Sequence, residues 1–139
     1  MSGALVWRAI LAGAGFIVAL SLLMSFGSGF LFRMVSLDQF AMLAFGLRVV
    51  SALADIGGGA IAGYIARRDG PWHGGIASLV ATVVMVPVSL LRMWWISREA
   101  DFNLDAGYWI DFGLWTVVGL VLAAVAGFLA AEFRKNQAG

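Results

Sequence analysis

The chain has no cysteine, one histidine (His73), two prolines and few charged residues. Without cysteine there are no disulfides, thiolate metal ligands or thiol catalysis. A single histidine argues against a histidine-ligated metal site, so the sequence predicts neither a metal nor a cofactor. Only 12% of the 139 residues are charged, and the net charge is +1 at pH 7. This balance gives no reason to expect a nucleic-acid partner.

What is abundant is hydrophobic: 62% of the residues, with a mean hydropathy of +0.94. A soluble domain is about half apolar and about a quarter charged, so we expect this chain to have the lipid bilayer as its solvent. A helix crosses the bilayer with about 20 apolar residues, and four segments are long enough, at about 5–32, 40–66, 73–96 and 108–132. We therefore expect one domain over 1–139, an all-α integral membrane bundle of four transmembrane helices.

Lysines and arginines favour the cytoplasmic side of a membrane and so predict the orientation. One side would hold Arg8, Arg67, Arg68, Arg134 and Lys135, and the other Arg33, Arg92 and Arg98. The expected topology therefore has both termini in the cytoplasm. If the source is a bacterium, the location is the inner membrane.

The two halves of the sequence resemble each other weakly. WRAILAGAGFIVALSLL aligns with WHGGIASLVATVVMVPVSLL, and AGYIARR aligns with AGFLAAEFR. One interpretation is two parallel helical-hairpin repeats related by an axis along the membrane normal. The other is that helices rich in glycine and alanine resemble each other by composition.

Small residues recur every four positions in three of the segments. Helices in lipid associate where small side chains let their backbones approach closely. The predicted packing positions are Ser51, Gly59, Gly63, Gly74, Ser78, Gly119, Ala123, Gly127 and Ala131. They could pack one four-helix bundle internally, or they could form a surface for a homo-oligomer or a larger membrane complex.

Asp55 occupies one position of this small-residue pattern and should face the bundle. It lies 12 residues before Arg67, about 18 Å into the membrane and near its midplane. A charge at that depth costs about 2.5–3.5 kcal/mol, which makes the residue a functional candidate. Arg48 lies about 10.5 Å away along the axis and leans away from Asp55, so we do not expect a direct bond. By depth, Ser21 and Thr82 are the predicted hydrogen-bond partners.

Three interpretations of Asp55 remain open. It could stay protonated as a structural hydrogen-bond donor. It could bind a proton or cation in a carrier or channel, with Arg48 setting the local potential. It could also contact a second subunit.

A basic cluster at the predicted cytoplasmic edge contains Arg67, Arg68 and His73. It could bind a lipid phosphate, or it could be a solvated positive end.

Among function classes, composition favours a non-enzymatic accessory or oligomeric membrane component. The alternative is a small proton- or ion-coupled transporter or channel that uses Asp55 and Arg48. An enzyme is least favoured, because no nucleophile, metal set or pair of carboxylates converges at one depth.

Overall fold

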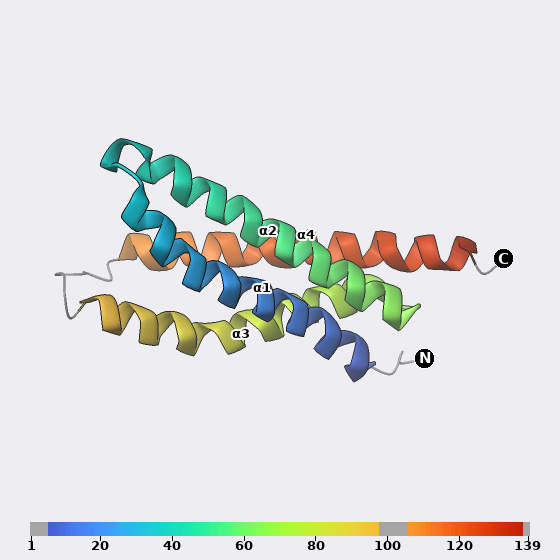
Figure 1. Cartoon of the computed structure of the whole chain (residues 1–139). Helices are drawn as coiled ribbons and strands as arrows, with labels where there is room; N and C mark the ends of the chain where they lie inside the picture. Colours follow the sequence, from blue (N-terminus) through green and yellow to red (C-terminus); the bar gives the residue numbers. More distant parts are fainter. Residues whose placement is uncertain (1–5, 98–105, 138–139) are drawn as a thin grey trace.

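The computed structural model describes residues 6–97 and 106–137. Its elements are α1 (Trp7–Met34), the short 3-10 helix η1 (Leu37–Gln39), α2 (Phe40–Ala66), α3 (Gly70–Ser97) and α4 (Ala106–Gln137), as Figure 1 shows. Each α-helix is long and apolar enough to cross a membrane. The predicted all-α bundle of four such helices is confirmed.

The helix boundaries differ from the predicted ones mainly in α3 and α4. Helix α3 begins at Gly70 rather than near 73, because Pro71 is tolerated in a first turn, where its missing N–H has no helical partner. Helix α4 continues through the charged residues after Glu132 to Gln137. Arg98, which was used for the orientation, lies outside the described residues.

The four helices pair into two hairpins, α1 with α2 and α3 with α4. The described chain starts and finishes at one end of the bundle, which we call the terminal end (Figure 1). The other end, where α1 ends, α2 begins, α3 ends and α4 begins, is called the loop end. The two ends of the described chain, residues 6 and 137, therefore lie at the same end of the bundle.

Helix α2 contacts each of the other three helices. Helix α3 also contacts all three, whereas α1 and α4 have no Cα atoms within 8 Å of each other in the described chain. In a bundle of two symmetric hairpin repeats, α4 would contact α1 in the way that α2 contacts α3. Because α1 and α4 do not touch in the described chain, the four helices are not arranged with two-fold symmetry. The repeat stays a prediction from the sequence.

At the terminal half of the bundle, helix backbones touch through small residues. A Cβ atom added to Gly63 would lie 2.5 Å from the Cα of Gly127, and one added to Gly59 would lie 2.6 Å from the Cα of Ala123. Helix α3 approaches the same face of α4, since a Cβ added to Gly74 would lie 3.3 Å from the Cα of Gly127. The small residues of α4 are thus enclosed between helices of the same chain.

Those α4 residues are Gly119, Ala123, Gly127 and Ala131, and all of them are buried. Ser78 is also buried, at 1% exposure. Ser51 differs from this group, because it is exposed on α2.

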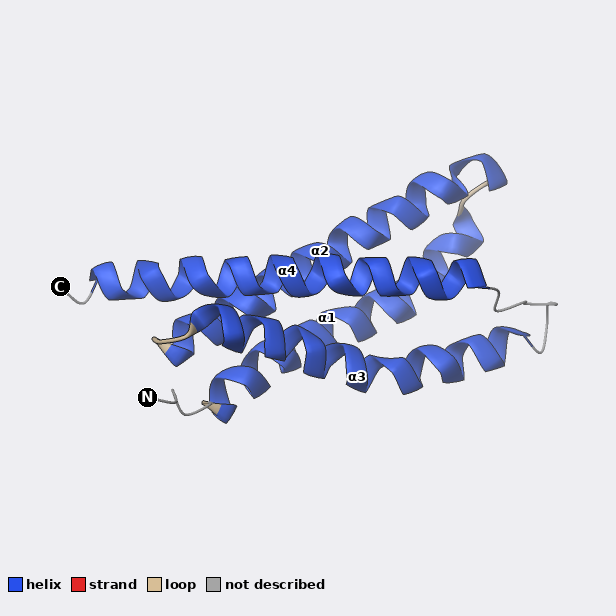
Figure 2. Cartoon of the chain, turned by 180° about the vertical axis from the view of Figure 1, so that it is seen from behind, coloured by secondary structure: helices blue, strands red, loops and turns tan. Residues whose placement is uncertain are grey.

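Toward the loop end the helices diverge. Figures 1 and 2 show the hairpin of α1 and α2 separating there from α3 and α4. In this half of the bundle the glycines make no close helix contacts, since a Cβ added to Gly27, Gly29, Gly46 or Gly113 would meet nothing within 4 Å.

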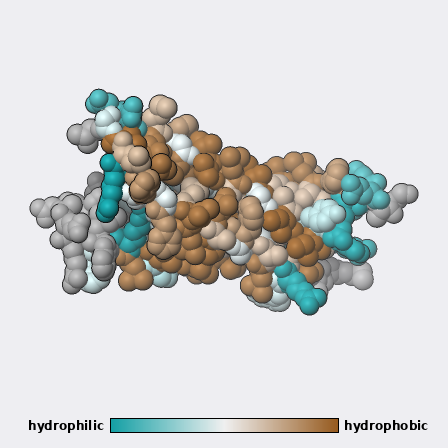
Figure 3. Space-filling model, in the orientation of Figure 1, coloured by the Kyte–Doolittle hydropathy of each residue, from teal (hydrophilic) through white to brown (hydrophobic). Residues whose placement is uncertain are grey.

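A hydrophobic band surrounds the bundle. Figure 3 shows apolar side chains along its length and hydrophilic side chains gathered at the two ends. Large apolar side chains such as Leu23, Phe26 and Phe128 are exposed on the surface. An exposed apolar girdle of this kind is unfavourable in water and favourable in lipid. Such a girdle is typical of a small membrane protein.

Candidate functional site

Asp55 lies in the middle of α2 and points between α3 and α4. Its Oδ1 accepts a hydrogen bond of 2.7 Å from the Ser78 hydroxyl of α3. Its Oδ2 lies against α4 at Gly119, where an added Cβ would be 2.5 Å away. The aspartate therefore occupies the boundary between the tightly packed terminal half and the open half.

The predicted hydrogen-bond partners of Asp55 were wrong. The hydroxyl of Thr82 donates to the Ser78 carbonyl four residues earlier, at 3.0 Å, a common arrangement for threonine in helices. The predicted depths also assumed that the helices are parallel. Because α2 and α3 are tilted relative to each other, the residue of α3 that meets Asp55 is Ser78, one helical turn before Thr82. Ser78 had been predicted as a packing residue.

A pocket of about 200 Å³, which we call the Asp55 pocket, opens beside this carboxylate. All four helices contribute to its lining, which combines hydroxyl groups with apolar side chains. Its polar residues are Ser21, Ser51, Asp55, Thr82, Ser89 and Thr116. The structure thus brings Ser21 and Thr82 to the same pocket as Asp55, although neither bonds to it.

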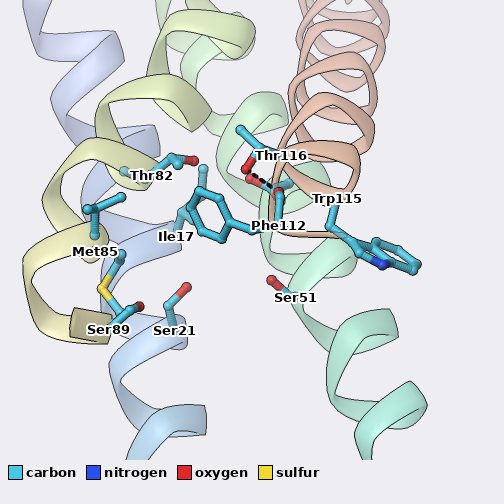
Figure 4. Close-up of a pocket in the computed structure, with 12 residues that line it drawn as sticks. Ile17, Ser21, Ser51, Thr82, Met85, Ser89, Phe112, Trp115 and Thr116 are labelled. Carbon is cyan, nitrogen blue, oxygen red and sulfur yellow. Dashed lines mark hydrogen bonds between the residues drawn. The ribbon is translucent and has the colours of Figure 1, made fainter. Parts of the chain in front are cut away.

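Phe112 of α4 reaches across the Asp55 pocket toward Ile17 of α1 (Figure 4). In this view its ring lies between two groups of hydroxyls. Toward the loop end are Ser21, Ser51 and Ser89, and further in are Thr82 and Thr116.

Arg48 forms a bidentate ion pair with Asp111 of α4. Its Nη1 donates to Asp111 Oδ1 at 2.8 Å, and its Nη2 donates to Oδ2. The guanidinium also lies 5.3 Å from the ring centroid of Trp115. The side chains of Arg48 and Asp111 are 44% and 43% exposed on the surface of the bundle.

A second cavity, of about 60 Å³, joins Arg48 to Asp55 along the interface between α2 and α4. Trp115 and Gly119 form its α4 side, and its volume suffices for water. Arg48 is therefore placed to act on Asp55 through the field or through water rather than by a direct bond.

Arg92 connects the other pair of helices near the loop end. It donates to the hydroxyls of Ser25 and Ser28 of α1, each at 3.0 Å. Sequence reasoning missed both arginine links. The sequence could not pair Arg48 with Asp111, because it does not give the order of the helices in the bundle.

His73 is not available for a lipid phosphate, which corrects the prediction for this residue. It is 3% exposed. Its Nε2 accepts from the backbone N–H of Val6 at 3.0 Å, and its Nδ1 lies 2.9 Å from the Asp69 carbonyl oxygen. The start of α1 covers the ring, a tertiary contact that the neighbouring arginines did not reveal. Arg67 and Arg68 remain exposed.

The chemistry available in the Asp55 pocket is one carboxylate surrounded by hydroxyl oxygens. Within residues 6–97 and 106–137 no cluster of three or more histidine, cysteine, aspartate or glutamate side chains could hold a metal ion. Oxygen ligands with one negative charge suit a proton or a small hard cation.

No protein-family model, curated protein or solved structure matches this chain.

Proposed function

We propose that this chain is a multi-pass protein of a bacterial inner membrane, with both termini cytoplasmic, that binds a proton or small cation at Asp55 as part of a transporter or channel. The observation that carries the proposal is the Asp55 pocket, in which hydroxyls from four helices converge with a carboxylate in the middle of α2. An ionisable group inside a membrane is costly and is retained mainly along ion pathways.

The two halves of the bundle support a one-sided path to Asp55. The terminal half is closed by backbone contacts at Gly59 and Gly63, whereas the loop half holds the pocket and its serines. In the proposed function, the ion enters from the loop end, passes Phe112 and reaches Asp55. Arg48, joined to Asp55 by the smaller cavity, sets the potential that the ion meets.

The proposal includes no enzymatic step, cofactor or nucleic acid, and the lipid bilayer is the expected partner. A non-enzymatic accessory role in a homo-oligomer or larger complex is the competing function. The enclosure of Gly119 and Gly127 between helices of one chain argues against the use of these two residues in such an assembly.

A flux assay in sealed vesicles tests the function. Purified protein is reconstituted with a pH-sensitive dye inside, and a pH or sodium gradient is imposed. We expect flux above that of protein-free vesicles, and its loss in Asp55→Asn. Asp38→Asn is the matched control, because Asp38 is an exposed acid of η1 outside the pocket. Wild-type vesicles no leakier than empty ones would refute the transport function and favour the accessory role.

Site-directed labelling tests the direction of access. Because the chain has no cysteine, single cysteines can be placed in the native background. A membrane-impermeant thiol reagent added at the loop side should modify Ser89→Cys, which lines the pocket, but not Ala77→Cys, which is fully buried. Equal modification of the two would contradict a path confined to the loop half.

A further inference from the structure

A second polar pocket lies at the terminal end, between the last turns of α2 and α4. We call it the terminal pocket. Its volume is about 360 Å³, within the range of small-molecule sites of about 300–1,000 Å³. It is lined by Tyr64, Arg67, Arg134, Lys135 and Gln137. It is separate from the Asp55 pocket and plays no part in the proposed function.

Two of its cations are placed by contacts at the end of α2. Arg67 ends α2 with φ of 62°, and its N–H bonds the Gly63 carbonyl at 3.2 Å. Arg134 of α4 donates through Nη1 to the Tyr64 carbonyl, and its Cζ lies 4.6 Å from the Tyr64 ring centroid. An arginine has five N–H donors, so Arg134 keeps donors for a ligand while it is held in place.

The charge of the terminal pocket is positive. Arg67, Arg134 and Lys135 contribute three positive charges, and Glu132 offsets one through its bond to Lys135 at 2.5 Å. The carbonyl ends of α2 and α4 add partial negative charge, which reduces but does not cancel the excess. An anion with several oxygen acceptors, such as a phosphate group, matches this arrangement.

The position of the pocket favours a phosphate that belongs to a lipid. It lies where the apolar spans of α2 and α4 end, at the depth of the headgroups. Tyr64 suits this interface, and the exposed side chains of Ile65 and Phe133 adjoin two pocket residues in sequence. Basic pockets between transmembrane helices bind anionic headgroups. We propose that the terminal pocket binds the phosphate group of an anionic phospholipid.

Native mass spectrometry in mixed micelles tests this binding. Phosphatidylglycerol and phosphatidylcholine are supplied in equal amounts, and the lipid retained by the protein is counted. We expect preferential retention of phosphatidylglycerol, lowered about fivefold by Arg67→Gln and by Lys135→Gln, since each removes one charge near the phosphate. Glu132→Gln should raise retention, because it frees Lys135.

The control is Arg8→Gln, which removes the same charge from an exposed position near the start of α1, outside the terminal pocket. If Arg8→Gln lowers retention as much as Lys135→Gln, or if wild type does not prefer the anionic lipid, the proposal is overturned. Lys135 bonds within its own helix, so its replacement should not unfold the protein.

Competition with inorganic phosphate at millimolar concentration distinguishes a site for a lipid phosphate from a site for a free phosphate ion. Failure to displace the lipid supports the lipid site, whereas full displacement assigns it to free phosphate and overturns the proposal.

Discussion

Replacing Gly63 by alanine tests whether backbone contact between α2 and α4 holds the bundle together. The added Cβ would lie 2.5 Å from the Cα of Gly127, while ordinary contact begins at 3.4 Å. The neighbouring atoms belong to a helix backbone, so no side-chain rotation relieves the clash. The two helices must separate by about 1 Å, which forfeits a quarter to a half of the attraction between facing atoms.

The expected cost follows from this separation. Overpacking a tight contact costs about 1–3 kcal/mol, and the better helix propensity of alanine returns about 0.5–1 kcal/mol. We therefore expect Gly63→Ala to lower the free energy of unfolding by about 1–2 kcal/mol. Unfolding can be followed by tryptophan fluorescence in micelles with increasing dodecyl sulfate, because the chain has six tryptophans.

The matched control is Gly46→Ala in the same helix. An added Cβ there meets nothing within 4 Å, so this variant should be neutral or slightly stabilising. Equal shifts of the unfolding midpoint in the two variants would refute the reasoning, since the difference between them depends entirely on the contact with α4.

Three further predictions address individual contacts. Ser78→Ala removes the donor to Asp55 and should shift the infrared carboxyl band that is lost in Asp55→Asn; an unchanged band would mean that the bond is not formed. His73→Ala removes the acceptor of the N–H that precedes α1, so amide hydrogen exchange should accelerate in the first turn of α1 and not in α4. A double-mutant cycle of Arg48→Gln and Asp111→Asn should give a coupling below about 1 kcal/mol, as for an ion pair in water at the loop end of the bundle; a coupling above about 2 kcal/mol would place the pair in lipid.

Much of the fold could be predicted from particular residues. Charges such as Arg8 and Arg33 delimit long apolar runs, and a bilayer requires each run to form a helix, because unpaired backbone groups are too costly in lipid. The small residues around Gly63 and Gly127 indicated close packing, and they lie at backbone contacts. Helix ends were less predictable, as α3 shows, because a first turn tolerates proline.

The candidate site was predictable in its central residue and not in its contacts. Asp55 stands out because a carboxylate at mid-membrane depth is costly. Its donor was assigned to Ser21 or Thr82 and is Ser78, since a rise along one helix does not fix how neighbouring helices tilt. Of the terminal pocket, only Arg67 was predicted, as part of the basic cluster that could bind a lipid phosphate. Its α4 residues were not predicted, because Arg134 meets α2 only in the folded bundle.

The sequence by itself determined that this chain forms four membrane-crossing helices, that small residues let them approach, and that one aspartate lies deep among them. These properties depend on local composition and on distance along one helix, which a bilayer converts into depth. The tertiary structure alone decided which helices touch, and with that the partners of Asp55, Arg48 and His73 and the existence of both pockets. Such contacts join residues up to 70 positions apart, and their pairing depends on helix order and tilt, which no local pattern encodes.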